Sequence, residues 1–139
     1  MKRIIALDVG TKTIGVATAS LPGGLPTPHC TISRKGVKTD VLKLVHLIQE
    51  LKISVVVVGM PYELDGSEGR SARLARQVGE SLAEASGLDV VYQDEQYSTV
   101  VAEERLRAAG YDGHRRKAKI DQAAAAIILG DFIATLSSN

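Results

Sequence analysis

Short apolar runs and amphipathic stretches follow one another along this chain, and their spacing predicts nine elements. The first third is rich in β-branched residues separated by turn-forming residues, which is typical of strands. Later segments repeat their apolar residues at helical spacing. Five strands are expected, over residues 4–8, 14–19, 29–33, 54–58 and 88–92. Four helices are expected, over residues 39–51 with Thr39 as N-cap, 74–87, 98–109 and 120–136, and residues 110–119 are expected to form a polar, basic loop.

The order of these elements is β-β-β-α-β-α-β-α-α, which predicts an α/β fold with a mixed sheet and helices on its faces. The unbroken β-branched run after Ser54 fits a central strand that is covered on both sides. The small residues Ala123–Ala126 are expected to let the last helix lie close to the sheet. With 139 residues and no interior linker, the chain is predicted to be a single domain over 1–139.

Composition narrows the class of protein. The net charge of +1 excludes an acidic tail or a strongly basic, histone-like protein. The apolar runs are shorter than the roughly 20 residues that span a bilayer, and Asp8 interrupts the apolar start too early for a signal peptide. A single cysteine, Cys30, cannot form an internal disulfide. We therefore expect a cytoplasmic protein without membrane association.

Three carboxylates lie where chemistry is expected. Asp8 ends the first strand, Glu95 follows the last strand beside Asp94, and Asp121 lies in the first turn of the last predicted helix. Ligands of open α/β sheets bind beyond the carboxyl ends of strands, and grouped carboxylates there favour Mg²⁺ or Mn²⁺. Each residue also has a structural alternative: Asp8 as a turn residue, Glu95 as a solvated strand end and Asp121 as a partner of the helix dipole.

Basic residues are unevenly distributed. Residues 105–139 carry a net charge of +3, with Arg115, Arg116 and Lys117 following His114 shortly before Asp121. We expect this cluster to bind phosphate, together with Lys12 in the turn after Asp8; the alternative is a solvated loop. If the cluster does not bind, the basic residues at 34, 35 and 38 are the next candidates.

Four segments resemble the YqgF family, the pre-16S ribosomal RNA nucleases also described as Holliday junction resolvase-like. They are ALDVGTKTIGVA at 6–17, VGMP at 58–61 with DGSEG at 65–69, DEQYST at 94–99 and IDQAA at 120–124. The resemblance implies an RNase H-like fold, with a five-stranded sheet whose second strand is antiparallel. It also implies that Asp8, Glu95 and Asp121 are the catalytic, metal-binding carboxylates, with Mg²⁺ or Mn²⁺ as cofactor.

The implied activity is metal-dependent hydrolysis of phosphodiester bonds in RNA, in the 5′-end processing of pre-16S rRNA. One departure from the family is Gln96, where an arginine is usual. Alternative functions are a junction-cleaving DNA endonuclease and a non-catalytic nucleic-acid-binding ribosome-assembly factor. The turn after Asp8 also resembles the phosphate motif of actin-like ATPases, but 139 residues leave no room for the second lobe that those proteins need.

Overall fold

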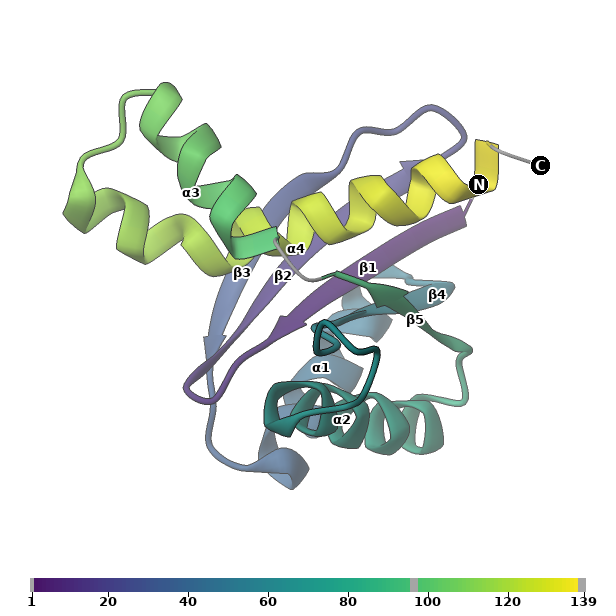
Figure 1. Ribbon diagram of the computed structural model, residues 1–139. Helices are drawn as coiled ribbons and strands as arrows, with labels where there is room; N and C mark the ends of the chain where they lie inside the picture. The colour runs from purple at the N-terminus through teal and green to yellow at the C-terminus, as the bar shows by residue number, and fades with distance from the viewer. Residues whose placement is uncertain (1, 96–97, 138–139) are drawn as a thin grey trace.

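The computed structural model describes residues 2–95 and 98–137, which form five strands and four helices in the expected order (Figure 1). The strands are β1 (Lys2–Val9), β2 (Thr13–Leu21), β3 (Thr27–Ser33), β4 (Val55–Met60) and β5 (Val90–Asp94). The helices are α1 (Val37–Leu51), α2 (Arg70–Ser86), α3 (Ser98–Ala108) and α4 (Gly113–Ser137).

The strands form one mixed sheet in the order β3-β2-β1-β4-β5. β2 is antiparallel to both β1 and β3, whereas β1, β4 and β5 are parallel. This arrangement confirms the predicted mixed five-stranded sheet with an antiparallel second strand. Because β1 is central and parallel to β4 and β5, its carboxyl end lies at the same edge as theirs.

Helices cover both faces of the sheet (Figure 1). Ile5, Leu7 and Val9 of β1 face the layer formed by α1 and α2. The alternating residues Ile4 and Ala6 face α4. Each large apolar side chain buried in this way stabilises the fold by about 1.5–3 kcal/mol.

Two glycines let α4 lie close to the sheet. A side chain at Gly15 of β2 would collide with the backbone of Asp121, and one at Gly59 of β4 would collide with Ile128. Ala124 and Ala125 of α4 are fully buried, as expected for the small-residue run. The close crossing of helix and sheet therefore depends on small residues on both partners.

The N-terminus of α1 differs from the prediction. The helix begins at Val37, so Thr39 is not its N-cap. Gly36 has a φ of 109°, a conformation that residues with side chains rarely adopt, and it turns the chain into the helix two residues earlier. The predicted end of α2 is confirmed: Gly87 follows Ser86 in the left-handed conformation.

The predicted basic loop over 110–119 is wrong, because α4 already begins at Gly113. Asp112 starts the helix, and its carboxylate accepts a hydrogen bond of 2.9 Å from the Arg115 N–H. The Arg116 guanidinium donates to the Tyr111 carbonyl at 2.8 Å, and the Arg115 guanidinium lies 4.6 Å from the Tyr111 ring centroid. These contacts hold the basic residues in the first turns of a helix.

Candidate active site

Asp8 lies at the end of an apolar row on the α4 face of β1. Ile4 and Ala6 precede it at intervals of two and are buried against α4. Asp8 itself is partly buried, and it pairs with Gly15 across the β1–β2 ladder. The carboxylate is therefore directed to the place where α4 crosses closest to the sheet.

Asp121 is brought to the same place by α4. Its backbone lies against Gly15, the neighbour of Asp8, and its carboxylate accepts a hydrogen bond of 2.5 Å from the Thr13 hydroxyl. Burial raises the pKa of Asp8 to about 6, and the charge of Asp121 adds to this shift. The structure thus brings together two of the three carboxylates expected from the sequence.

Gly15 should be sensitive to the smallest substitution, because its missing side chain is what allows this approach. We expect Gly15→Ala to destabilise the protein by about 1–3 kcal/mol in urea unfolding, since either α4 or β2 must shift. RNA cleavage should fall as well, because Asp121 moves with the helix. Gly113→Ala is the matched control: a side chain there, in the first turn of α4, would meet only the Arg116 guanidinium at an ordinary contact distance of 3.8 Å, so stability should be unchanged or higher by up to about 1 kcal/mol. Equal effects of the two substitutions would contradict the close contact.

Glu95 follows β5, and its N–H donates to the Met60 carbonyl of β4 at 2.9 Å. Its side chain is paired with Asp131 of α4 rather than with Asp8 or Asp121. Burial, a hydrogen bond to Asp131 and the charges of Asp131, Asp94 and Asp8 raise the pKa of Glu95 to about 8. Near neutral pH, Glu95 therefore holds its proton far more readily than a solvent-exposed glutamate does.

The four carboxyls form two pairs, Asp8 with Asp121 and Glu95 with Asp131. Within residues 2–95 and 98–137, no three His, Cys, Asp or Glu side chains are grouped closely enough to hold one metal ion. The expected three-carboxylate cluster around a single ion is therefore not assembled in this structure. The pairs are linked electrostatically, because the charge of Asp8 contributes to the raised pKa of Glu95.

Asp131 was missed by the sequence analysis, although a signal for it exists. Asp121, Ala124, Ile128 and Asp131 follow each other at intervals of three, four and three, which is one stripe along a helix. A second acidic residue on the stripe that carries Asp121 could have been a candidate. The Ala-rich composition of the helix favoured an interpretation in terms of packing against the sheet instead.

A buried ion pair anchors the turn after Asp8. The Arg34 guanidinium donates to Asp40 of α1 and to the Gly10 carbonyl, both at 3.0 Å. The other oxygen of Asp40 accepts the Lys35 N–H at 2.8 Å, and the Asp40 side chain is fully buried. Arg34 therefore fixes the β1–β2 turn to α1, and with only 9% of its side chain exposed it offers little surface for binding phosphate.

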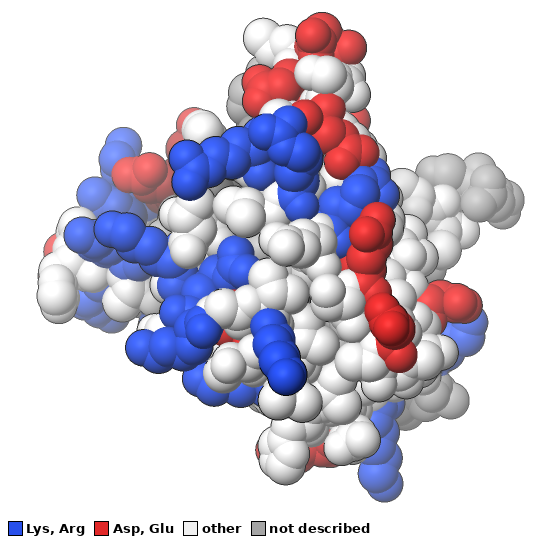
Figure 2. Space-filling view, turned by 90° about the horizontal axis from the view of Figure 1, so that it is seen from below, with Lys and Arg blue, Asp and Glu red and all other residues white. Residues whose placement is uncertain are grey.

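The candidate phosphate-binding residues lie on one side of the molecule. Lys12 is exposed in the β1–β2 turn, and Arg115 and Lys117 are exposed in the first turns of α4. α3 and the beginning of α4 form a hairpin that extends beyond the sheet (Figure 1). Figure 2, which views the molecule from the side of α1 and α2, shows Lys and Arg gathered toward the left of that face and Asp and Glu mainly at its top and right.

The RuvX family model, described as Holliday junction resolvase, matches residues 2–135. The chain belongs to this family. The match covers nearly all of the sequence and confirms the resemblance to the YqgF family, which is the same family as RuvX. It also confirms the predicted enzyme class, a hydrolase acting on phosphodiester bonds.

Relatives from the RuvX family can be aligned with this chain over nearly its full length. A Picosynechococcus protein is 40% identical over 131 residues, which cover 94% of this chain and 91% of the relative. A Fusobacterium nucleatum protein is 40% identical over 135 residues, covering 96% and 97%. Both carry the name "Putative pre-16S rRNA nuclease".

Solved structures agree on the fold. Thermus thermophilus RuvC in complex with a Holliday junction substrate aligns with a TM-score of 0.63 at 10% identity, covering 97% of this chain and 96% of that one. The fowlpox virus Holliday junction resolvase aligns with a TM-score of 0.56 at 12% identity, covering 96% and 99%. These likenesses confirm the RNase H-like fold.

In the part of the chain that the structure describes, no helix is long and apolar enough to cross a membrane. Gln96, the departure from the family pattern, lies outside the described residues.

Proposed function

We propose that this chain is a divalent-metal-dependent nuclease of the cytoplasm that hydrolyses phosphodiester bonds during 5′-end processing of precursor 16S rRNA. The observation that carries the proposal is the approach of Asp121 to Asp8 across Gly15, in a chain of the RuvX family. The names of the full-length relatives supply the RNA substrate.

The carboxyl pairs fit Mg²⁺ or Mn²⁺. All four side chains offer hard oxygen ligands, which these ions prefer. Two carboxyls with raised pKa values, Asp8 and Glu95, are the groups that a nearby cation would return to the charged form. Asp8 and Asp121 would hold the ion, and Glu95, which contacts Asp131 in this structure, would orient the attacking water. A bound ion would stabilise charge on the phosphate and favour deprotonation of water.

The protein's own residues then bind and orient the substrate. Lys12, Arg115 and Lys117 would contact phosphates on either side of the scissile bond, and they offer only hydrogen-bond donors. Arg116 would support them by fixing the hairpin through the Tyr111 carbonyl. Glu95, with its pKa raised to about 8, can orient a water molecule by donating a hydrogen bond when protonated or accepting one when ionised.

The hairpin cluster should control the salt dependence of RNA binding. We expect an Arg115→Gln, Lys117→Gln, Lys119→Gln variant to flatten the log–log salt slope by about 2–3 units, because each lost phosphate contact removes about 0.7–0.9. These three side chains are exposed, whereas Arg116 is kept because it supports the hairpin. Fluorescence anisotropy over a salt series measures the slope.

Lys38→Gln with Lys43→Gln is the control for this measurement. Both lysines are exposed on α1, in the layer opposite α4, so the slope should change by less than about one unit. A larger change in the α1 variant than in the hairpin variant would move the interface to α1.

Cleavage of precursor 16S rRNA by highly purified protein tests the function. We expect cleavage with Mg²⁺ or Mn²⁺, none in EDTA and almost none by Asp8→Asn protein. A four-way DNA junction is the second substrate to include, because the family description and the RuvC likeness both concern Holliday junctions. Cleavage of the junction alone would replace the RNA proposal. Tight RNA binding without cleavage by the wild type would favour an assembly factor.

A further inference from the structure

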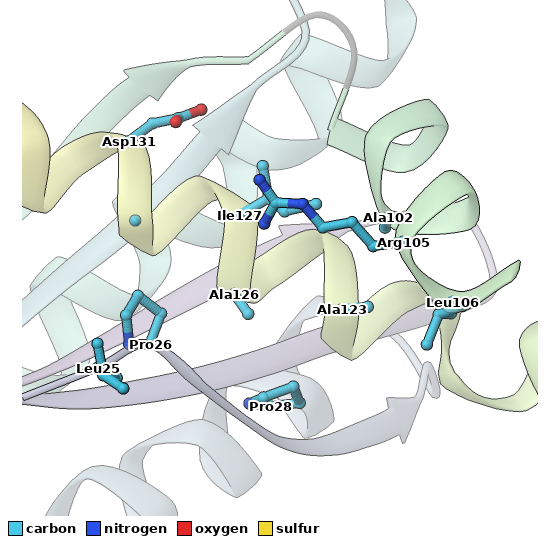
Figure 3. A pocket seen from close by; sticks show the side chains of 11 residues that line it. Leu25, Pro26, Pro28, Ala102, Arg105, Leu106, Ala123, Ala126, Ile127 and Asp131 are labelled. Atoms are coloured by element: carbon cyan, nitrogen blue, oxygen red, sulfur yellow. The ribbon is translucent and has the colours of Figure 1, made fainter. Parts of the chain in front are cut away.

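A cavity of about 500 Å³ lies against α4, between α3 and the connection from β2 to β3 (Figure 3). On the helix side it is lined by the small residues Ala123, Ala126 and Gly130. Because these residues are short, they leave space that larger side chains would fill. A cavity of this volume is in the range that holds a small molecule or one nucleotide.

The wall opposite α4 is apolar. Leu25, Pro26 and Pro28 come from the β2–β3 connection and the start of β3, and Leu106 comes from α3. Leu25 is 80% exposed. A ligand with a flat apolar face would remove this surface from water, which is favourable.

Two charged side chains of opposite sign complete the cavity. Figure 3 shows the Arg105 side chain reaching from α3 across Ile127, with Asp131 further along α4. A guanidinium can only donate hydrogen bonds, and a carboxylate can only accept them. A complementary ligand therefore presents acceptors, donors and a flat apolar face together. Phosphate alone does not meet this requirement, because it offers only acceptors and Asp131 would repel it.

The cavity adjoins the candidate active site. Asp131 lines the cavity and is also the hydrogen-bond partner of Glu95. A carboxylate has about four lone-pair sites, so Asp131 can contact Glu95 and a ligand at the same time. The exposed basic residues Arg115 and Lys117 lie on the hairpin that α3 forms with α4. A nucleic-acid strand held there and passing Glu95 can place one base in the cavity.

We propose that this cavity is a base pocket that receives an unpaired guanine of the substrate strand, close to the cleaved bond. Arg105 donates to the guanine O6 and N7 atoms, and Asp131 accepts from its N1–H and 2-amino groups. Arg105 is then a specificity-determining residue. The proposal rests on the proposed function for the identity of the strand, and it extends that function to the choice of sequence.

Binding of short single-stranded RNAs tests the pocket without cleavage. The RNAs are uridine throughout except at one central position, which is guanine, inosine, adenine or abasic, and the buffer contains EDTA. A bidentate contact to guanine is expected to give about 10- to 100-fold tighter binding than adenine or the abasic site. Inosine, which lacks the 2-amino group, should lie between them. Guanosine monophosphate should compete, whereas cytidine monophosphate and ribose 5-phosphate should not.

Arg105→Met keeps the length of the side chain and should abolish the guanine preference. Arg107→Met is its matched control: Arg107 is on the same helix and carries the same charge, but it pairs with Glu103 and does not line the cavity. It should keep the preference. Ala126→Leu, which fills the cavity without changing any charge, should lose the preference like Arg105→Met, and urea unfolding verifies that both variants are folded.

The outcomes separate this pocket from the nuclease proposal. Equal affinity for all four RNAs overturns the pocket, and so does a loss in Arg105→Met that is the same for every RNA. Guanine preference in a protein that cleaves no RNA supports the pocket and overturns the nuclease. Cleavage without any base preference supports the nuclease and overturns the pocket.

Discussion

Replacing Asp8 with asparagine is expected to reduce metal-dependent RNA cleavage by about 10³-fold while leaving the fold intact. Asparagine has nearly the same shape as aspartate, but it removes the charge that would bind the metal beside Asp121. Single-turnover cleavage measures the loss, and circular dichroism verifies the fold. Glu84→Gln, at an exposed carboxyl on α2, is the control and should cleave like the wild type.

The same substitution should make the metal-free protein more stable at neutral pH. Burial raises the pKa of Asp8 from its ordinary value of 3.8 to about 6 in the folded protein, so ionisation disfavours folding. The contribution of Asp8 to the stability of the wild type in EDTA is then greatest below about pH 4 and is lost as the pH rises through 6. A shift of this size corresponds to about 2–3 kcal/mol at pH 7, which Asp8→Asn should recover. Urea unfolding between pH 4 and pH 8 measures it. A loss of several kcal/mol in the variant would instead show that Asp8 is a structural residue.

Removal of Asp40 should destabilise the protein by about 3–5 kcal/mol, because it leaves the Arg34 guanidinium buried without its partner. The Asp40 side chain is fully buried, and that of Arg34 is 9% exposed, so water cannot replace the lost contact. The Lys35 N–H loses its acceptor as well. Urea unfolding of Asp40→Ala measures the loss, and RNA cleavage should fall with it, because Arg34 also holds the Gly10 carbonyl in the turn after Asp8.

Two comparisons make this result interpretable. Glu68→Ala breaks the pair with Arg76, whose side chains are about one-third exposed, and it should cost less than about 1 kcal/mol. Asp40→Leu combined with Arg34→Met removes both charges and should be less destabilising than Asp40→Ala alone. An Asp40→Ala variant as stable as Glu68→Ala would contradict the buried pair.

The sequence predicted the elements wherever apolar periodicity and glycine signals agreed. The β-branched run from Val55 to Val58 is the inner strand β4, and Gly87 ends α2 as expected. The carboxyl ends of β1 and β5 meet at the edge where Asp8 and Glu95 were expected. These features depend on local propensity and on general rules of parallel sheets, both of which a single sequence contains.

The features that were missed depend on polar contacts, some local and some between distant residues, that apolar periodicity does not indicate. Two glycines and a dense basic cluster favoured a loop before Ile120, yet Asp112 and Tyr111 hold that stretch in α4. The pairing of Glu95 with Asp131 joins residues of β5 and α4, and no local pattern specifies which carboxyls meet. The contact of Arg34 with Gly10 joins residues 24 positions apart, and the spacing of apolar residues does not predict it either.

The uninterrupted course of α4 fixes the rotation about the helix axis between the proposed phosphate-binding residues and Asp121. Its 25 residues correspond to a length of roughly 37 Å, at about 1.5 Å per residue. Lys117 and Asp121 lie about one helical turn apart in the same helix, so their relative orientation is set by the helix geometry. Inserting a single residue between them would turn the cationic end by about 100° relative to Asp121. If both residues act as proposed, inserting or deleting one residue between them should therefore impair RNA cleavage more than substituting an exposed residue of the same turns.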